Sequence, residues 1–160
     1  MKKVENFCLL GWVNDIQFDG TGDKLVWVCN NSSISLVTSA DPTAVRTLNF
    51  NALPLMSIMW KSNECIIGVG FDTCLYSFKV GNEIKMESTF DNESKGKCGK
   101  VSAMSHFKSL DTYAISPSAE GPNKNKHNST IIEIRTYRGN TAKFSTISNE
   151  GKMIVWDTKV

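Results

Sequence analysis

Short apolar runs separated by turn-forming residues dominate this chain, and their lengths are typical of β-strands. The first four runs cover residues 13–18, 24–29, 34–38 and 45–50, where Asp41-Pro42 reads as a break before the fourth. The next four cover residues 55–60, 65–70, 74–80 and 84–90. Three more cover residues 131–137, 142–148 and 153–157. The pattern predicts an all-β chain built from three similar units.

A turn residue before the third run of each unit gives the spacing of the repeat. These residues are Asn31, Asp72 and Glu150, which lie 41 and then 78 residues apart. The excess in the second interval matches a polar stretch at residues 91–128, and its removal leaves two nearly equal intervals. Units of strands that repeat at about 40–45 residues are typical of β-propeller blades. We therefore expect blades at about residues 11–50, 54–90 and 130–157.

The last unit ends in Trp156-Asp157, the dipeptide that names WD repeats, and Gly11-Trp12 stands where such repeats often carry Gly-His. The third unit lacks an obvious fourth run. Closed propellers have about four to eight blades, so three blades predict a partial propeller with open faces and strand edges. We expect a partner, or self-association through the open blade edges, to cover them.

Residues 91–128 differ in composition from the blades and predict a flexible inserted arm before the last blade. They are rich in Lys, Gly, Ser and Asn, and Pro117 and Pro122 exclude a long helix. Within the arm, residues 101–110 predict a short amphipathic helix. Its apolar face comprises Ala103, Met104, Phe107 and Leu110. This face either docks in a groove of a partner or folds back onto the rim of the propeller.

Composition excludes several classes of protein. The formal net charge is +2, with 41% hydrophobic and 21% charged residues, which is ordinary for a globular chain and argues against a nucleic-acid partner. No apolar run approaches the roughly 18 residues of a membrane helix, and the N-terminus does not resemble a secretory signal. The sequence thus predicts a cytoplasmic protein with no membrane partner. Its five cysteines are expected to be reduced thiols.

The residues of common catalytic and metal sites are not assembled in this sequence. His106 and His127 have no carboxylate or cysteine at ligand spacing, and the cysteines form no Cys-x-x-Cys pair. Gly68-Val69-Gly70 lacks the third glycine of a dinucleotide loop. We expect no enzymatic activity, no cofactor and no metal site.

Several short segments, in this order along the chain, resemble the WD-repeat subunit (subunit 1) of the actin-related protein 2/3 complex, in its C-terminal part. They are Gly11-Trp12-Val13, residues 24–28, Thr47-Leu48, Leu53-Pro54-Leu55, residues 107–111, residues 126–129 and residues 154–157.

The resemblance implies about three blades of a seven-bladed propeller, in a structural subunit that supports actin nucleation and filament branching. In that family the arm before the last blade carries a short helix that reaches toward actin. The matching residues are Met104, Phe107 and Leu110, with Lys108 beside them and Ala103 on the same face. Implied partners are the other complex subunits and the actin filament, in the cytoplasmic actin cytoskeleton.

Two departures from the family leave alternatives open. Its first four blades and its helical tail have no counterpart in this sequence. The alternatives are a generic WD-repeat adaptor without an actin role, or a truncated fragment that does not assemble.

Overall fold

The computed structural model describes residues 11–89 and 126–158, and these residues form three antiparallel β-sheets. The first sheet contains β1 (Val13–Phe18), β2 (Lys24–Cys29), β3 (Ser33–Thr38) and β4 (Asp41–Asn49). The second contains β5 (Leu55–Ser62), β6 (Cys65–Gly70), β7 (Leu75–Val80) and β8 (Ile84–Thr89). The third contains β9 (Ile131–Tyr137), β10 (Asn140–Ser148) and β11 (Met153–Asp157).

The strands that the hydrophobic pattern predicts are confirmed, and within each sheet they pair in sequence order. One expectation was wrong: Asp41-Pro42 does not interrupt the sheet, because β4 begins at Asp41. Proline lacks a backbone N–H, and a sheet tolerates that loss on an edge strand. β4 is such an edge strand within the described first sheet.

The turn between the second and third strands contains a left-handed residue at the same place in all three sheets. The residues that follow the turn residues Asn31, Asp72 and Glu150 adopt a left-handed backbone conformation. Their φ angles are 58° at Ser32, 61° at Thr73 and 79° at Gly151. Glycine reaches this region without strain, whereas serine and threonine adopt it at a cost. The repeat seen in the sequence is therefore also a repeat of backbone geometry.

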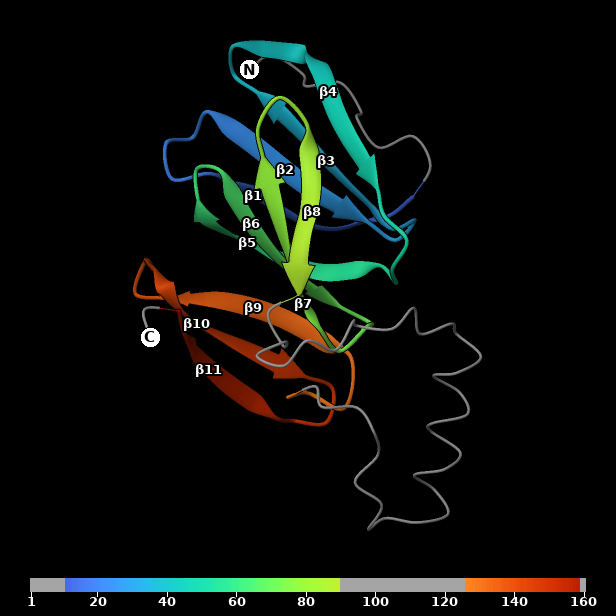
Figure 1. Cartoon of the computed structure of the whole chain (residues 1–160), viewed down its shortest axis with the longest axis vertical. Coiled ribbons are helices and arrows are strands. Elements are labelled where there is room, and N and C mark those ends of the chain that lie inside the picture. Colours follow the sequence, from blue (N-terminus) through green and yellow to red (C-terminus); the bar gives the residue numbers. More distant parts are fainter. Residues whose placement is uncertain (1–10, 90–125, 159–160) are drawn as a thin grey trace.

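The three sheets stack in the manner of neighbouring propeller blades, with the second between the first and the third (Figure 1). Two apolar clusters form the seams. The first joins the first two sheets and includes Val28, Leu36, Ile58 and Phe78. The second joins the second and third sheets and includes Met59, Ile67, Ile134, Phe144 and Trp156.

The innermost strands β1, β5 and β9 come from successive blades and contact one another in turn. This arrangement confirms the predicted all-β, partial WD-repeat β-propeller. We refer to the three sheets as blades 1, 2 and 3. A smaller buried cluster of Trp27, Cys29 and Val37 lies on the face of blade 1 that points away from blade 2.

Candidate functional site

The partner-binding residues predicted from the sequence are Ala103, Met104, Phe107, Lys108 and Leu110. They and the predicted helix at residues 101–110 lie outside the described residues. The described residues offer the surfaces of the blades themselves as candidate binding sites.

In each blade, a side-chain oxygen in the turn between the second and third strands accepts a hydrogen bond from the segment that leads into the blade. Asp72 Oδ2 accepts the backbone N–H of Leu53 at 2.6 Å, and Glu150 Oε1 accepts that of Asn128 at 3.3 Å. In blade 1 the acceptor is Asn30 Oδ1, which binds the N–H of Trp12 at 2.9 Å. These bonds explain why a polar residue recurs at the turn, and they fix where each innermost strand begins.

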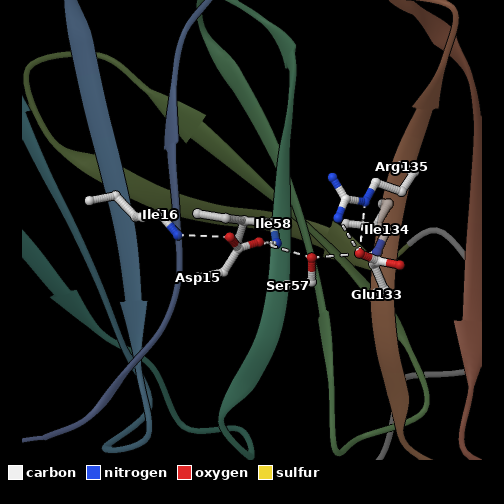
Figure 2. A network of polar contacts seen from close by, with 7 residues as sticks. All are labelled: Asp15, Ile16, Ser57, Ile58, Glu133, Ile134 and Arg135. Atoms are coloured by element: carbon white, nitrogen blue, oxygen red, sulfur yellow. Dashed lines mark hydrogen bonds and ion pairs between the residues drawn. The ribbon is translucent and has the colours of Figure 1, made fainter.

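A hydrogen-bonded ladder crosses both seams at the innermost strands (Figure 2). Asp15 Oδ2 on β1 accepts the hydroxyl of Ser57 and the N–H of Ile58 on β5, both at 2.9 Å. Ser57 Oγ in turn accepts the N–H of Ile134 on β9 at 3.4 Å. At each seam an innermost side chain of one blade thus binds the backbone of the next blade.

Strand register places Asp15, Ser57 and Glu133 at equivalent positions, each one residue before an isoleucine. Glu133 is thus the next acceptor in the ladder, on a blade with no described neighbour beyond it. Its carboxylate binds the guanidinium of Arg135, with Nε donating to Oε1 at 2.7 Å (Figure 2). At the other end, the N–H of Ile16 is bound by the carboxylate of its own neighbour, Asp15 Oδ1, at 2.8 Å.

The two outer faces of the described stack therefore differ in character. We call the free face of blade 3 the outgoing face, because it is equivalent to the faces of blades 1 and 2 that point to the next blade. Cross-strand pairing assigns to it Glu133, Arg135, Ser145, Ile147, Met153 and Val155. We call the face of blade 1 that points away from blade 2 the incoming face; pairing assigns to it Val13, Ile16, Phe18, Leu25 and Trp27, of which Trp27 is buried.

Both outer faces nevertheless expose some large apolar side chains. On the incoming face Phe18 is 64% exposed, and on the outgoing face Met153 and Val155 are 63% and 66% exposed. Their counterparts at the seams are buried, such as Trp60, which is equivalent to Phe18. Exposed apolar side chains on a sheet face mark a surface for another protein element. These faces are the candidate binding surfaces of the described residues.

A cluster of buried polar side chains connects different segments of blade 3 through hydrogen bonds. His127 Nε2 lies 2.7 Å from Thr146 Oγ1, which also accepts the indole N–H of Trp156 at 2.8 Å. Burial lowers the pKa of His127 below its ordinary value, nearby Lys152 lowers it further, and Glu150 acts in the opposite direction. Sequence reasoning assigned no role to His127, because its distance from Trp156 along the chain hid this contact.

The described residues contain no cluster of His, Cys, Asp and Glu side chains that could hold a metal ion. Among the same residues, no helix is long and apolar enough to cross a membrane. Cys65 and Cys74 form no disulfide, but Cys29 is disulfide-bonded, so the expectation of reduced cysteines was wrong there. Disulfide formation depends on sulfurs meeting in space, which the spacing along the chain did not reveal.

Comparison with curated proteins identifies similar chains in several organisms. No protein-family model matches the sequence. Actin-related protein 2/3 complex subunit 1A-B of Xenopus laevis is 28% identical over 154 residues, covering 93% of this chain and 42% of the relative. Subunit 1 of Schizosaccharomyces pombe is 24% identical, covering 91% and 45%. Subunit 1A of Arabidopsis thaliana is 26% identical, covering 91% and 42%.

The resemblance read from the sequence is confirmed by these relatives, which carry the same subunit name in an amphibian, a yeast and a plant. The chain spans less than half the length of each of these relatives.

Proposed function

We propose that this chain is a non-enzymatic structural subunit of an actin-related protein 2/3 complex, and that it contributes to actin nucleation and filament branching through protein–protein contacts. The observation that carries the proposal is the similarity of more than nine-tenths of the chain to proteins named as subunit 1 of that complex. The partners are then the other complex subunits and the actin filament, in the cytoplasmic actin cytoskeleton.

The described surfaces support a binding role. Two blade faces expose large apolar side chains, and each carries at its innermost strand the polar group that binds a neighbouring blade elsewhere in the stack. Surfaces of this kind bury area against another protein instead of holding a small substrate.

The inserted arm is the second proposed contact. Its predicted apolar face of Ala103, Met104, Phe107 and Leu110, with Lys108 beside it, would enter a groove on actin or on a neighbouring subunit. A short amphipathic segment binds in this way by burying one face against the groove.

A pull-down of the tagged full chain from its own cytosol, followed by mass spectrometry, tests the proposal. Recovery of actin-related proteins together with companion subunits supports it. Recovery of unrelated proteins supports the alternative of a general WD-repeat adaptor. Retention of chaperones alone supports the other alternative, a fragment that does not assemble.

A further inference from the structure

The hairpin of β7 and β8 places two lysines side by side on one face of blade 2. Lys79 and Lys85 stand directly opposite each other in the strand register. They lie on the face that also carries Ile67, which packs in the seam with blade 3. Like charges directly opposite each other on a sheet are destabilising. The hairpin therefore holds two ammonium groups together at a cost in stability, and an anion between them would remove that cost.

Blade 3 does not cover these lysines within the described residues. Its strands β9 and β10 contact β5 and β6 of blade 2, but none of its described strands contacts β7 or β8. The tip of the hairpin lies far from blade 3 (Figure 1). The face of the hairpin that carries Lys79 and Lys85 is therefore open to a ligand on the described surface.

Only one of the two charges is balanced by a neighbouring acid. Glu83 Oε2 lies 3.3 Å from Lys85 Nζ, and both side chains are exposed. Lys79 has no ion-pair partner among the described residues. Exposed ion pairs contribute little to stability, so an anion can take the place of Glu83 at Lys85 at low cost.

A cavity of about 560 Å³ opens at this hairpin. It is lined by Lys79, Gly81, Asn82, Glu83 and Lys85. Its volume lies within the range of pockets that hold small molecules. The lining supplies ammonium and amide donors and contains no large apolar side chain, so it suits a polar, negatively charged group.

Arg46 on β4 of blade 1 orients the turn at the tip of the hairpin. Its Nη1 donates to Gly81 O at 2.6 Å. The described chain has no cis peptide bond, and in a trans peptide the C=O and N–H point in opposite directions. The N–H of Asn82 therefore points away from Arg46 and blade 1, toward the side on which Lys79 and Lys85 lie.

We propose that this cavity binds a phosphomonoester group. Its oxygens lie between the ammonium groups of Lys79 and Lys85 and accept the N–H of Asn82, while Glu83 turns out to solvent. Lysine binds phosphate as a point charge. A phosphomonoester carries about −1.5 to −2 charges at neutral pH, which matches two ammonium groups better than the single charge of a carboxylate. The site depends on blade 2 and Arg46, so it stands or falls separately from binding to actin-related proteins.

Nuclear magnetic resonance of the isotope-labelled full chain, titrated with glycerol 3-phosphate at constant ionic strength, tests the site. Saturable shifts are expected at the amides of Lys79, Asn82 and Lys85, and acetate at the same concentrations should give much smaller ones. Lys79→Gln should weaken the affinity about fivefold. Glu83→Gln should strengthen it, because the ligand then no longer competes with this acid for Lys85.

Lys143→Gln is the matched control. It removes a partly exposed lysine of blade 3 whose Nζ lies 3.1 Å from Asp157 Oδ2, and it should leave the affinity unchanged. Circular dichroism confirms that each variant is folded. Vesicles of phosphatidylcholine with phosphatidic acid present the same group on a membrane. Co-sedimentation with them assigns the site to a lipid headgroup, and its absence alongside glycerol 3-phosphate binding assigns it to a soluble ester.

Four results would overturn the proposal. They are a lack of saturable shifts at the hairpin, an equal response to acetate, an equal loss of affinity in Lys143→Gln and Lys79→Gln, and a Glu83→Gln variant that binds more weakly than the wild-type chain.

Discussion

His127 Nε2 lies 2.7 Å from Thr146 Oγ1, and both residues are buried in blade 3. Trp156 can only donate through its indole, so Thr146 accepts from it, and the threonine hydroxyl hydrogen is then free to donate to His127. The histidine follows directly after Lys126, whose ammonium lies 4.4 Å from the centre of the Trp156 ring. Thr146 thus links the segment that leads into blade 3 to its last strand, β11, through side-chain hydrogen bonds.

Replacement of Thr146 by valine keeps the side-chain shape and removes the hydroxyl. It leaves the indole N–H of Trp156 and the imidazole of His127 without this partner in a buried site. We expect a loss of about 2 kcal/mol in the free energy of unfolding, measured by urea denaturation. Thr136→Val, on the exposed part of β9, is the matched control and should change stability by less than about 0.5 kcal/mol. Equal effects would refute the role of the cluster.

Stability should fall as the pH drops below the ordinary pKa of histidine. Burial lowers the pKa of His127 in the folded state, so the unfolded chain binds the proton more readily and protonation favours unfolding. The contribution is fully present above about pH 6.5 and is lost as the pH falls toward the folded pKa. Urea denaturation at pH 7.5 and at a series of lower values measures it.

His127→Gln removes this titration and should flatten the profile between neutral pH and about pH 5. The lowered pKa values of Asp19 and Asp41 act only at more acidic pH, near and below their ordinary value of 3.8, so they do not obscure this window. A variant profile as steep as that of the wild type would assign the effect to other groups.

Ser57 takes part in the hydrogen bonds at both seams, because its hydroxyl donates to Asp15 and accepts from the backbone N–H of Ile134. Ser57→Ala leaves the N–H of Ile134 without its acceptor between two blades. We expect the free energy of unfolding to fall by about 1–2 kcal/mol. Ser145→Ala, on the open face of blade 3, is the control and should be close to neutral. Differential scanning calorimetry of both variants checks the difference.

The left-handed turn positions predict opposite effects of two reciprocal substitutions. Ser32→Gly relieves a side chain held at a φ of 58° and should raise the free energy of unfolding by about 1 kcal/mol. Gly151→Ser imposes the same conformation on serine and should lower it by a similar amount. Thermal melts of the two variants should therefore shift in opposite directions; a shift in the same direction would contradict the assignment.

The arm gives a prediction about binding. Met104→Ala combined with Phe107→Ala removes two large apolar side chains from its predicted docking face. If the arm reaches actin or the complex, affinity should fall by about tenfold or more, measured by co-sedimentation with filaments or by pull-down. Ser105→Ala, on the opposite face of the predicted helix, is the control. Unchanged binding by the double variant would remove the arm from the interface.

The strands and their grouping could be predicted because both depend on local sequence. Alternating or continuous apolar runs bounded by turn residues mark each strand, and Asp72 and Glu150 recur because each blade needs an oxygen at that turn. The start of β4 was missed because the tolerance for Pro42 depends on its place at a sheet edge.

Contacts between blades could not be predicted in the same way. The roles of Asp15 and Ser57 arise from contacts between residues that lie 42 and 77 positions apart in sequence. The exposure of Phe18 and Val155 likewise depends on which blade stands beside them.

The alternation of acid and hydroxyl along the innermost strands also bears on how the chain folds. A compact chain in which blade 1 stacks directly on blade 3, with blade 2 excluded, is one misordered arrangement of three sheets. Such a stack would set Asp15 against Glu133, whereas the native order separates them by Ser57. The same few atoms that join the blades thus disfavour this misordered arrangement and favour the order in which the middle blade lies between the other two.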